Sequence, residues 1–180
     1  MTQLNVTNNI VLDYHKSLYY QNVTDGYIGY NYFAQAPDSP YLDGELQFDV
    51  NCSDISLENN TLYNLTYDGI EIYRSSNFLI QDNWIEDIGA GTHIEHGLIK
   101  NITIISNNFV NSMVLANDVI ELNIINNEIN PGTINIDNCS TVAIINNTIC
   151  GNPIQTGNSD DVTIEGNEYI CSTVLGFFSS

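Results

Sequence analysis

An asparagine-centred repeat of about 20 residues constrains the fold of this chain more than any other feature. Six doublets of turn-forming residues recur along residues 50–170, and they are Asn59-Asn60, Asp82-Asn83, Asn107-Asn108, Asn126-Asn127, Asn146-Asn147 and Gly166-Asn167. Their second members are 23, 25, 19, 20 and 20 residues apart. The positions five and three residues before and two residues after each second member are apolar at 17 of 18 sites, the exception being Thr103. A repeat this regular predicts a solenoid.

The apolar positions of one repeat alternate with period two, as in a β-strand that buries every second side chain. The doublet follows as a sharp corner, because Asn and Gly tolerate the left-handed backbone conformation. A second apolar strand begins two residues after the corner. A third begins about seven residues after it, at Leu115, Ile134, Ile154 and Val174.

One coil of this kind cannot bury its own aliphatic residues, so successive coils must stack through parallel strands about 4.8 Å apart. The sequence therefore predicts an all-β fold, a single-stranded parallel β-helix of about eight to nine coils of about 20 residues each. The chain also holds 27 Asn, which disfavours long helices because the Asn side chain competes for local backbone hydrogen bonds. We expect the Asn side chains at one corner to stack into a ladder.

The whole chain, residues 1–180, is expected to form one domain, with regular coils over residues 50–170 and a C-terminal edge strand over residues 171–180. Residues 1–49 fit the repeat less regularly and are expected to form irregular, Tyr-rich coils. Asn9 continues the pattern, and the interval of 51 residues from it to Asn60 suffices for two coils.

Tyrosine is concentrated near the N-terminus, where seven of the eleven Tyr lie within residues 14–41. One interpretation is that these rings pack over a wider coil or a lateral loop. The other is that they form a platform for sugars, because flat rings pair with the apolar faces of pyranoses.

The charge balance of the chain argues against some classes of binding partner. The chain carries Lys+Arg 3 against Asp+Glu 22, a formal net charge of −19. Because a phosphate-binding surface needs clustered Lys or Arg, we expect no binding to nucleic acid or to anionic membranes. No apolar run approaches the roughly 20 residues of a membrane span, so we expect no membrane insertion.

A family resemblance is carried by the stretches DGIEIYRSSNFLIQDNWIEDIG, NITIISNNF, ELNIINNEI and VAIINNTI. They resemble the pectin-lyase-like superfamily of right-handed parallel β-helices, closely over residues 50–170 and loosely over residues 1–49. The resemblance implies the right-handed fold, which the periodicity alone does not fix. Members include polysaccharide lyases, polygalacturonase-type hydrolases, alginate epimerases, viral tailspikes, adhesins and surface proteins, so the fold does not choose the function.

None of the catalytic patterns of this superfamily carries over. The Gly-His-Gly of polygalacturonase-like enzymes has its nearest counterpart in Glu95-His96-Gly97, but the only Asp-Asp pair, Asp160-Asp161, follows that His instead of preceding it. Pectate lyases use Arg or Lys as a base beside calcium, and Arg74 is the only Arg. The Asp-Pro-His-Glu of alginate epimerases is absent. If the chain is an enzyme, we expect a glycoside hydrolase, lyase or epimerase with another site.

A His-containing insertion, GAGTHIEHG at residues 89–97, is the best place to look for such a site. We expect it to form an exposed loop, either solvated and inert or a metal or proton-transfer site, since His titrates near neutrality and ligates transition metals. Two carboxylates on adjacent coils can stand about 5 Å apart, the spacing of a retaining glycosidase pair. The candidate catalytic residues are His93, Glu95, His96, Asp87, Asp82 and Glu71, with Asp68, Arg74 and Glu86 nearby.

The excess of carboxylates suggests a structural Ca²⁺, because this ion takes six to eight oxygen ligands. The sequence contains no contiguous calcium-loop motif. We expect no other cofactor.

Two covalent features are candidates. Cys150 and Cys171 are 21 residues apart, about one coil, and either form a disulfide across adjacent coils or remain buried thiols. Cys52 and Cys139 are about four coils apart, too far to bond. The candidate glycosylation sites, each an Asn-x-Ser/Thr, are Asn5, Asn22, Asn51, Asn59, Asn64, Asn101, Asn138 and Asn146.

These features support two hypotheses of function. The first is a non-catalytic structural protein located outside the cell, on a cell surface or on a virion, which assembles end to end with copies of itself and carries glycans. The second is a polysaccharide-active enzyme or a glycan-binding tailspike with a site near His93.

Overall fold

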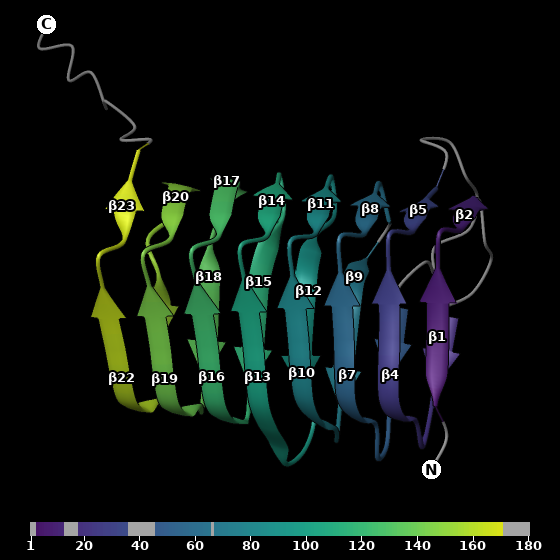
Figure 1. Cartoon of the computed structure of the whole chain (residues 1–180). Coiled ribbons are helices and arrows are strands. Elements are labelled where there is room, and N and C mark those ends of the chain that lie inside the picture. The colour runs from purple at the N-terminus through teal and green to yellow at the C-terminus, as the bar shows by residue number, and fades with distance from the viewer. Residues whose placement is uncertain (1–2, 13–17, 36–45, 66, 171–180) are drawn as a thin grey trace, which may run out of the picture.

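Every element in the described part of the chain is a β-strand. The computed structural model describes residues 3–12, 18–35, 46–65 and 67–170, and 23 strands there form three parallel sheets. Strands of successive coils lie side by side along one axis in Figure 1, with the N-terminal coil on the right and the C-terminal coil on the left. Two sheets hold eight strands and the third holds seven, which agrees with the predicted solenoid.

Sheet A contains the longest strands and faces the viewer in Figure 1. Its strands are β1 (Leu4–Thr7), β4 (Thr24–Gly29), β7 (Ser53–Glu58), β10 (Ser76–Gln81), β13 (Ile99–Ile105), β16 (Val119–Ile125), β19 (Ser140–Ile145) and β22 (Asp160–Glu165). Sheet B, along the top, consists of β2 (Ile10–Leu12), β5 (Tyr32–Ala34), β8 (Thr61–Tyr63), β11 (Trp84–Glu86), β14 (Asn108–Val110), β17 (Glu128–Gly132), β20 (Thr148–Gly151) and β23 (Glu168–Tyr169).

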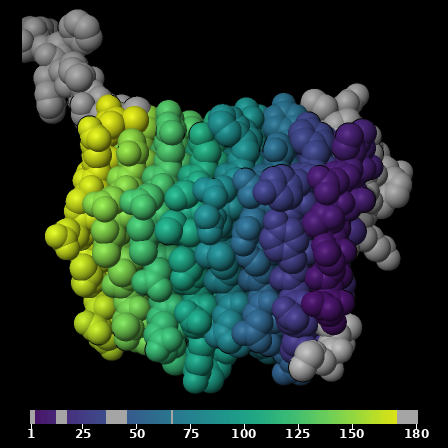
Figure 2. All heavy atoms as spheres, viewed as in Figure 1, coloured from purple at the N-terminus to yellow at the C-terminus, as the bar shows by residue number. Residues whose placement is uncertain are grey.

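Sheet C closes each coil. It runs, in chain order, through β3 (Leu18–Tyr20), β6 (Leu46–Phe48), β9 (Asp68–Tyr73), β12 (Ala90–Glu95), β15 (Met113–Asn117), β18 (Ile134–Asp137) and β21 (Gln155–Thr156). The same three strands therefore recur in nearly every coil, and Figure 2 shows successive coils in contact with one another along the axis on the face turned to the viewer.

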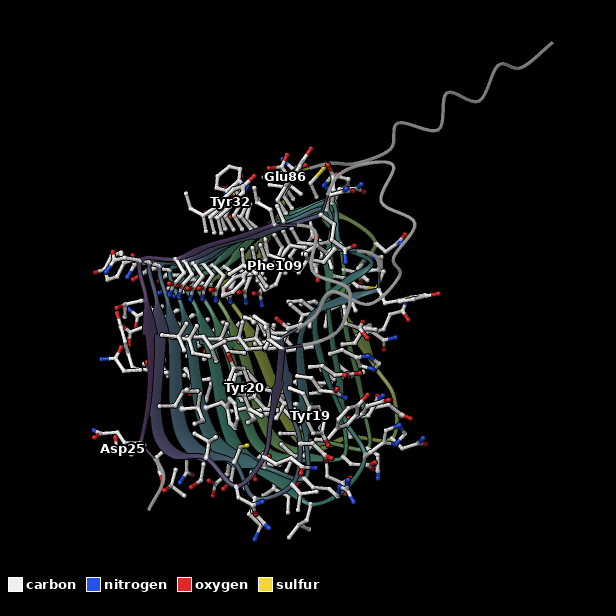
Figure 3. All side chains as sticks on the ribbon, turned by 90° about the vertical axis from the view of Figure 1, so that its right-hand side faces the viewer. Tyr19, Tyr20, Asp25, Tyr32, Glu86 and Phe109 are labelled. Atoms are coloured by element: carbon white, nitrogen blue, oxygen red, sulfur yellow. The ribbon has the colours of Figure 1, made fainter. Side chains whose placement is uncertain are left out.

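The core is a set of aliphatic rows that run parallel to the axis. In sheet A, Ile80, Ile104, Ile124 and Ile144 occupy equivalent positions of successive strands and are fully buried. Viewed along the axis in Figure 3, Phe109 lies inside sheet B, whereas Tyr32 and Glu86 lie outside it. Alternation along most strands thus separates core from surface, as the sequence predicts.

A ladder of asparagine side chains, buried at every position except its two ends, runs along the corner between sheets A and B. Each member except the last donates two hydrogen bonds, from its backbone N–H and from Nδ2, to the Oδ1 of the next member, at 2.9 to 3.0 Å. From the second member on, Nδ2 also donates to a carbonyl of the preceding coil. The members are Asn9, Asn31, Asn60, Asn83, Asn107, Asn127, Asn147 and Asn167. The predicted ladder is confirmed.

The predicted phase of one repeat is wrong by one residue. Asn107, not Asn108, belongs to the ladder, and Asn108 begins strand β14. The residue before each ladder Asn has positive φ, and here that residue is Ser106, at 56°. With this correction Ile102 replaces Thr103 in the buried row, so the single apolar exception disappears. The sequence pattern favours Asn107-Asn108 as the corner doublet, because Ser is less typical than Asn at such a corner.

The third strand of that coil shifts with the corner. Val114, rather than Leu115, is buried and pairs with Ile134, while the side chain of Leu115 is only half-buried. Val174 and the predicted edge strand over residues 171–180 lie outside the described residues.

Between Asn9 and Asn60 the chain forms two coils joined at Asn31, as expected, with intervals of 22 and 29 residues. The Tyr residues of this region divide between core and surface. The ring of Tyr20 stacks on Phe48 with centroids 5.1 Å apart, whereas Tyr30 is 59% exposed. Some Tyr rings of this region therefore pack against the core, and others are exposed to solvent. Tyr14 and Tyr41 lie outside the described residues.

Within the described residues no helix is long and apolar enough to cross a bilayer.

Candidate functional site

The His-containing insertion is a strand, not the predicted exposed loop. Strand β12 pairs in parallel with β9 and β15, and the side chain of His93 is 20% exposed on the outer face of sheet C. Only His96, Gly97 and Leu98 form an exposed connection to β13. Gly91, in the middle of the predicted loop, lies inside the strand and packs against the core. A Cβ there would lie 2.8 Å from the core side chain of Phe109.

Parallel pairing brings His93 between carboxylates. Its Nδ1 lies 3.2 Å from Asp68 Oδ2, and its Nε2 lies 3.2 Å from Glu95 Oε2. The other oxygen of Glu95 lies 2.6 Å from His96 Nε2. The hydrogen bond with Asp68 raises the pKa of His93 against the opposing effect of burial, and the negative charges of Asp68, Glu95 and Glu71 add to this rise. The imidazole is therefore at the centre of an acidic cluster.

Glu71 is the most buried member of this cluster. It pairs directly with His93 across the sheet and is 7% exposed. The Tyr73 hydroxyl donates a hydrogen bond to Glu71 Oε1. Burial, followed by this hydrogen bond and the charge of Glu71, raises the pKa of Tyr73 above its ordinary value. One ligand atom from each of Asp68, Glu71 and His93 lies within 4.8 Å of the others, so these three residues form a candidate cation site.

A hollow of about 310 Å³ adjoins the cluster on the same face of sheet C. Arg74 Nη2 lies 2.7 Å from Asp49 Oδ1, and Tyr19 OH donates to Asp49 Oδ2 at 2.6 Å. These partners, with the Tyr19 hydrogen bond first, hold the pKa of Asp49 well below its ordinary value. The rings of Tyr73 and His96 stack with centroids 5.5 Å apart. The residues that line the hollow are Tyr19, Gln47, Asp49, Tyr73, Arg74 and His96.

Two predicted site residues lie elsewhere. Asp82 is exposed at the corner between β10 and β11, where Gln81 Nε2 donates to it at 2.9 Å. Asp87, at the corner after β11, lines a separate hollow of about 460 Å³ and accepts a hydrogen bond from Asn111. No hydrogen bond or ion pair in the described part of the chain joins either residue to the His93 cluster. His93, Glu95, His96 and Glu71 are brought together.

Sequence reasoning missed four residues of this face, namely Tyr19, Gln47, Asp49 and Tyr73. The position of Tyr73 two residues after Glu71 was an available signal, because residues i and i+2 of a strand share a face. Nothing comparable points to Tyr19 and Asp49, which reach the site through the irregular coils near the N-terminus.

The predicted glycosylation sites occupy the surface. Seven of the eight sequon Asn are exposed, and Asn64 is half-buried with its Nδ2 donating to Gln35 O at 3.0 Å. All except Asn5, which lies in β1, have positive φ, and all but Asn5 and Asn101, which lies in β13, sit at corners between strands.

The cysteines divide into two pairs. Cys52 and Cys139 are free and buried, as their separation predicts. Cys150 is disulfide-bonded. Its predicted partner, Cys171, lies outside the described residues.

Comparison with known proteins agrees with this architecture. The sequence model of the family described as right-handed beta helix region matches residues 2–129. A structure of the Streptococcus pneumoniae surface protein and adhesin PfbA superposes with a TM-score of 0.61 at 16% identity, covering 81% of this chain and 47% of that one. A second PfbA structure, described as a surface adhesin, gives 0.56 at 17% identity, covering 81% and 44%.

The chain spans less than half the length of these two structures. At such low identity the likeness concerns the fold. No curated protein matches the sequence.

Proposed function

The chain belongs to the right-handed β-helix family, and on this basis we propose that it is a non-catalytic module of an extracellular surface protein that binds a glycan on the outer face of sheet C. The observation that carries the proposal is the hollow of about 310 Å³ beside Arg74. Hollows from about 300 Å³ upward accommodate small ligands when a few polar groups converge in them.

The lining of this hollow suits a sugar. The stacked rings of Tyr73 and His96 and the half-exposed ring of Tyr19 offer flat apolar surface, which pairs with the apolar face of a pyranose. The guanidinium of Arg74 donates hydrogen bonds, and the amide of Gln47 both donates and accepts them, as sugar hydroxyls require. Because the chain carries a formal net charge of −19, a neutral glycan is favoured over an acidic one.

Two further observations support an extracellular location. Cys150 is disulfide-bonded, and disulfides persist in oxidising compartments. The exposed sequon Asn at the corners are accessible for N-glycosylation, which is part of the proposal. Mass spectrometry tests N-glycosylation. The mass of the intact protein secreted from a glycosylating host is compared with its mass after enzymatic deglycosylation.

A glycan array containing neutral and acidic oligosaccharides tests the binding proposal. We expect binding to neutral glycans that is at least about tenfold weaker in His96→Ala, whose side chain is 71% exposed. Trp84→Ala is the matched control, because Trp84 is an exposed aromatic residue of sheet B, and it should bind like the wild type.

Absence of binding, or equal binding by His96→Ala, would overturn the proposed site. Incubation of the bound glycans with the protein, followed by mass spectrometry, tests the non-catalytic part. Release of shorter products would show that the chain is an enzyme.

The last described coil supports a second part of the proposal, end-to-end assembly with other copies. Ile164 and Tyr169 are 48% and 52% exposed, whereas their equivalents one coil earlier, Ile144 and Ile149, are fully buried. A row of core positions is thus open at this coil. Stacking of another coil would bury it, as it does along the rest of the solenoid.

The asparagine ladder gives this assembly a defined register. Each earlier member donates its backbone N–H to Oδ1 of the next Asn, so we expect the N–H of Asn167 to donate to Asn9 Oδ1 of a second copy. We expect sedimentation velocity over a concentration series to show growing oligomers, and electron microscopy to show filaments. Ile164→Asp should abolish both. A protein that remains monomeric at every concentration would contradict end-to-end assembly. The proposed glycan site would be unaffected, because the glycan array tests it separately.

A further inference from the structure

We propose that Asp68, Glu71 and His93 bind one divalent transition-metal ion on the outer face of sheet C. One ligand atom from each lies within 4.8 Å of the others, which suits a single ion held at about 2 Å by each ligand. This site lies beside the glycan hollow and shares none of its lining residues.

A local irregularity of the sheet turns the three side chains to one face. Between Ala90 and Thr92 strand β12 contains one residue more than β15, namely Gly91. Strand β9 follows β12 without a shift, so the extra residue is matched there by Gly69. Because one extra residue reverses the alternation, Asp68 comes to face the same side as Glu71 and His93.

The two extra residues must be glycine for these strands to lie together. A Cβ on Gly69 would lie 2.6 Å from the backbone oxygen of Gly91, which has no room to move within the ladder of the sheet. Close packing of the two backbones keeps Asp68 Oδ2 within 3.2 Å of His93 Nδ1.

The orientation of His93 is the one found in metal sites. Its Nδ1 points toward Asp68, whereas its Nε2 lies 3.2 Å from Glu95 Oε2. Metal-binding histidines commonly donate the N–H of the other ring nitrogen to a carboxylate, which fixes the ring. Glu95 occupies that position, and His96 in turn contacts the second oxygen of Glu95 at 2.6 Å.

The charge of the cluster favours a cation. Three carboxylates, Asp68, Glu71 and Glu95, surround one imidazole, and Glu71 is 7% exposed. Arg74 is directed to Asp49 instead. Carboxylates gathered where solvent is largely excluded repel one another strongly, and a divalent ion among them removes that repulsion.

The ligand types select the metal. Ca²⁺ prefers six to eight oxygen ligands, whereas two carboxylates and one imidazole suit Zn²⁺, Co²⁺ or Ni²⁺. Three protein ligands also leave coordination positions open to water or to a ligand. We therefore assign the site to a transition metal rather than to the structural Ca²⁺ suggested by the composition.

Calorimetric titration of the chelator-treated protein with ZnCl₂ tests the assignment. We expect one Zn²⁺ per chain, and at least about tenfold weaker binding in His93→Asn and in Asp68→Asn. Glu86→Gln is the matched control: it removes one carboxylate of sheet B, which Trp84 contacts, and should leave the affinity unchanged. Titration with Co²⁺ should produce visible absorption bands that both site variants lose. CaCl₂ should neither bind nor compete.

Circular dichroism of both site variants without metal establishes that they fold. If one variant does not fold, the Zn²⁺ affinity of the other variant and the Co²⁺ spectrum of the wild type test the assignment. The assignment is overturned if the wild type binds no Zn²⁺, if both folded variants bind it equally well, or if Ca²⁺ displaces it.

Discussion

The side-chain oxygen of Asn127 accepts two hydrogen bonds from Asn107, one from the backbone N–H at 2.9 Å and one from Nδ2 at 3.0 Å. The same Nδ2 donates to Ile80 O at 2.8 Å, one coil earlier. A single buried amide therefore connects three successive coils. Because its partners are buried as well, removing it leaves several polar groups without hydrogen bonds in the interior.

Asn107→Ala should lower the free energy of unfolding by about 2 to 4 kcal/mol, since each buried group left without a partner costs about 1 to 3 kcal/mol. Asn108→Ala is the matched control. Asn108 lies outside the ladder at the start of β14, and its substitution should cost less than about 1 kcal/mol. Urea denaturation followed by circular dichroism measures both. A larger cost for Asn108→Ala would restore the phase predicted from the doublets.

Gly91→Ala should destabilise the protein by about 1 to 3 kcal/mol, because the new methyl group enters a filled core. Its Cβ would lie 2.8 Å from Ile85 Cγ2 and from Phe109 Cδ1. Leu98→Ala, in the exposed connection after β12, should change stability by less than about 0.5 kcal/mol. Thermal melting of the two variants compares them. Equal melting temperatures would favour an exposed loop at Gly91.

Asp49 should make stability depend on pH in the acid range. Its folded pKa lies below the ordinary value of 3.8, so its contribution is present above that pH and is lost as the pH falls toward the folded pKa. Asp49→Asn should lower the free energy of unfolding by about 2 kcal/mol at pH 7, a size typical of hydrogen bonds to a charged group. The loss should become progressively smaller below about pH 4.

Urea titrations at a series of pH values measure this difference. Glu128→Gln is the control, because the exposed side chain of Glu128 makes no hydrogen bond in the described part of the chain. A difference between Asp49→Asn and the wild type that stays constant down to pH 2 would contradict the assigned role of Asp49.

The two free thiols should be unreactive in the folded protein. Cys52 and Cys139 are 1% and 2% exposed, and burial raises the pKa of both thiols. Because the thiolate is the reactive form, a thiol reagent should label neither quickly until the chain unfolds. Denatured, unreduced protein should then yield two thiols.

The same assay tests the predicted pairing of the remaining cysteines. If Cys171 is the partner of Cys150, Cys171→Ser should raise the count in denatured protein from two thiols to three. A count that stays at two would exclude this pairing.

Much of the fold follows from local pattern. Period-two apolar residues, Asn at corners and a repeat near 20 residues specify strands, turns and stacking without reference to distant contacts. The pattern fails at Asn107, where two adjacent Asn compete for one ladder position. Local propensity cannot choose between them, because the choice depends on which side chain meets Asn83 and Asn127 in the neighbouring coils.

The candidate site was predictable only in part. The sequence indicates a histidine- and carboxylate-rich coil, and the structure brings His93, Glu71 and Glu95 together there. Asp82 and Asp87 are equally near in sequence but turn away at corners. Distance along the chain does not distinguish these cases, because pairing between coils decides which side chains meet.

The all-β solenoid, its core and its asparagine ladder follow from the amino-acid sequence, since each arises from a repeated local pattern that the regular coils satisfy in the same way. The register at Asn107 and the face to which Asp68 turns depend instead on contacts between neighbouring coils. The tertiary structure also decided that Tyr19 reaches Asp49 from a coil 30 residues earlier. These outcomes depend on single extra residues and irregular coils, whose effects appear only when the neighbouring coil is in place.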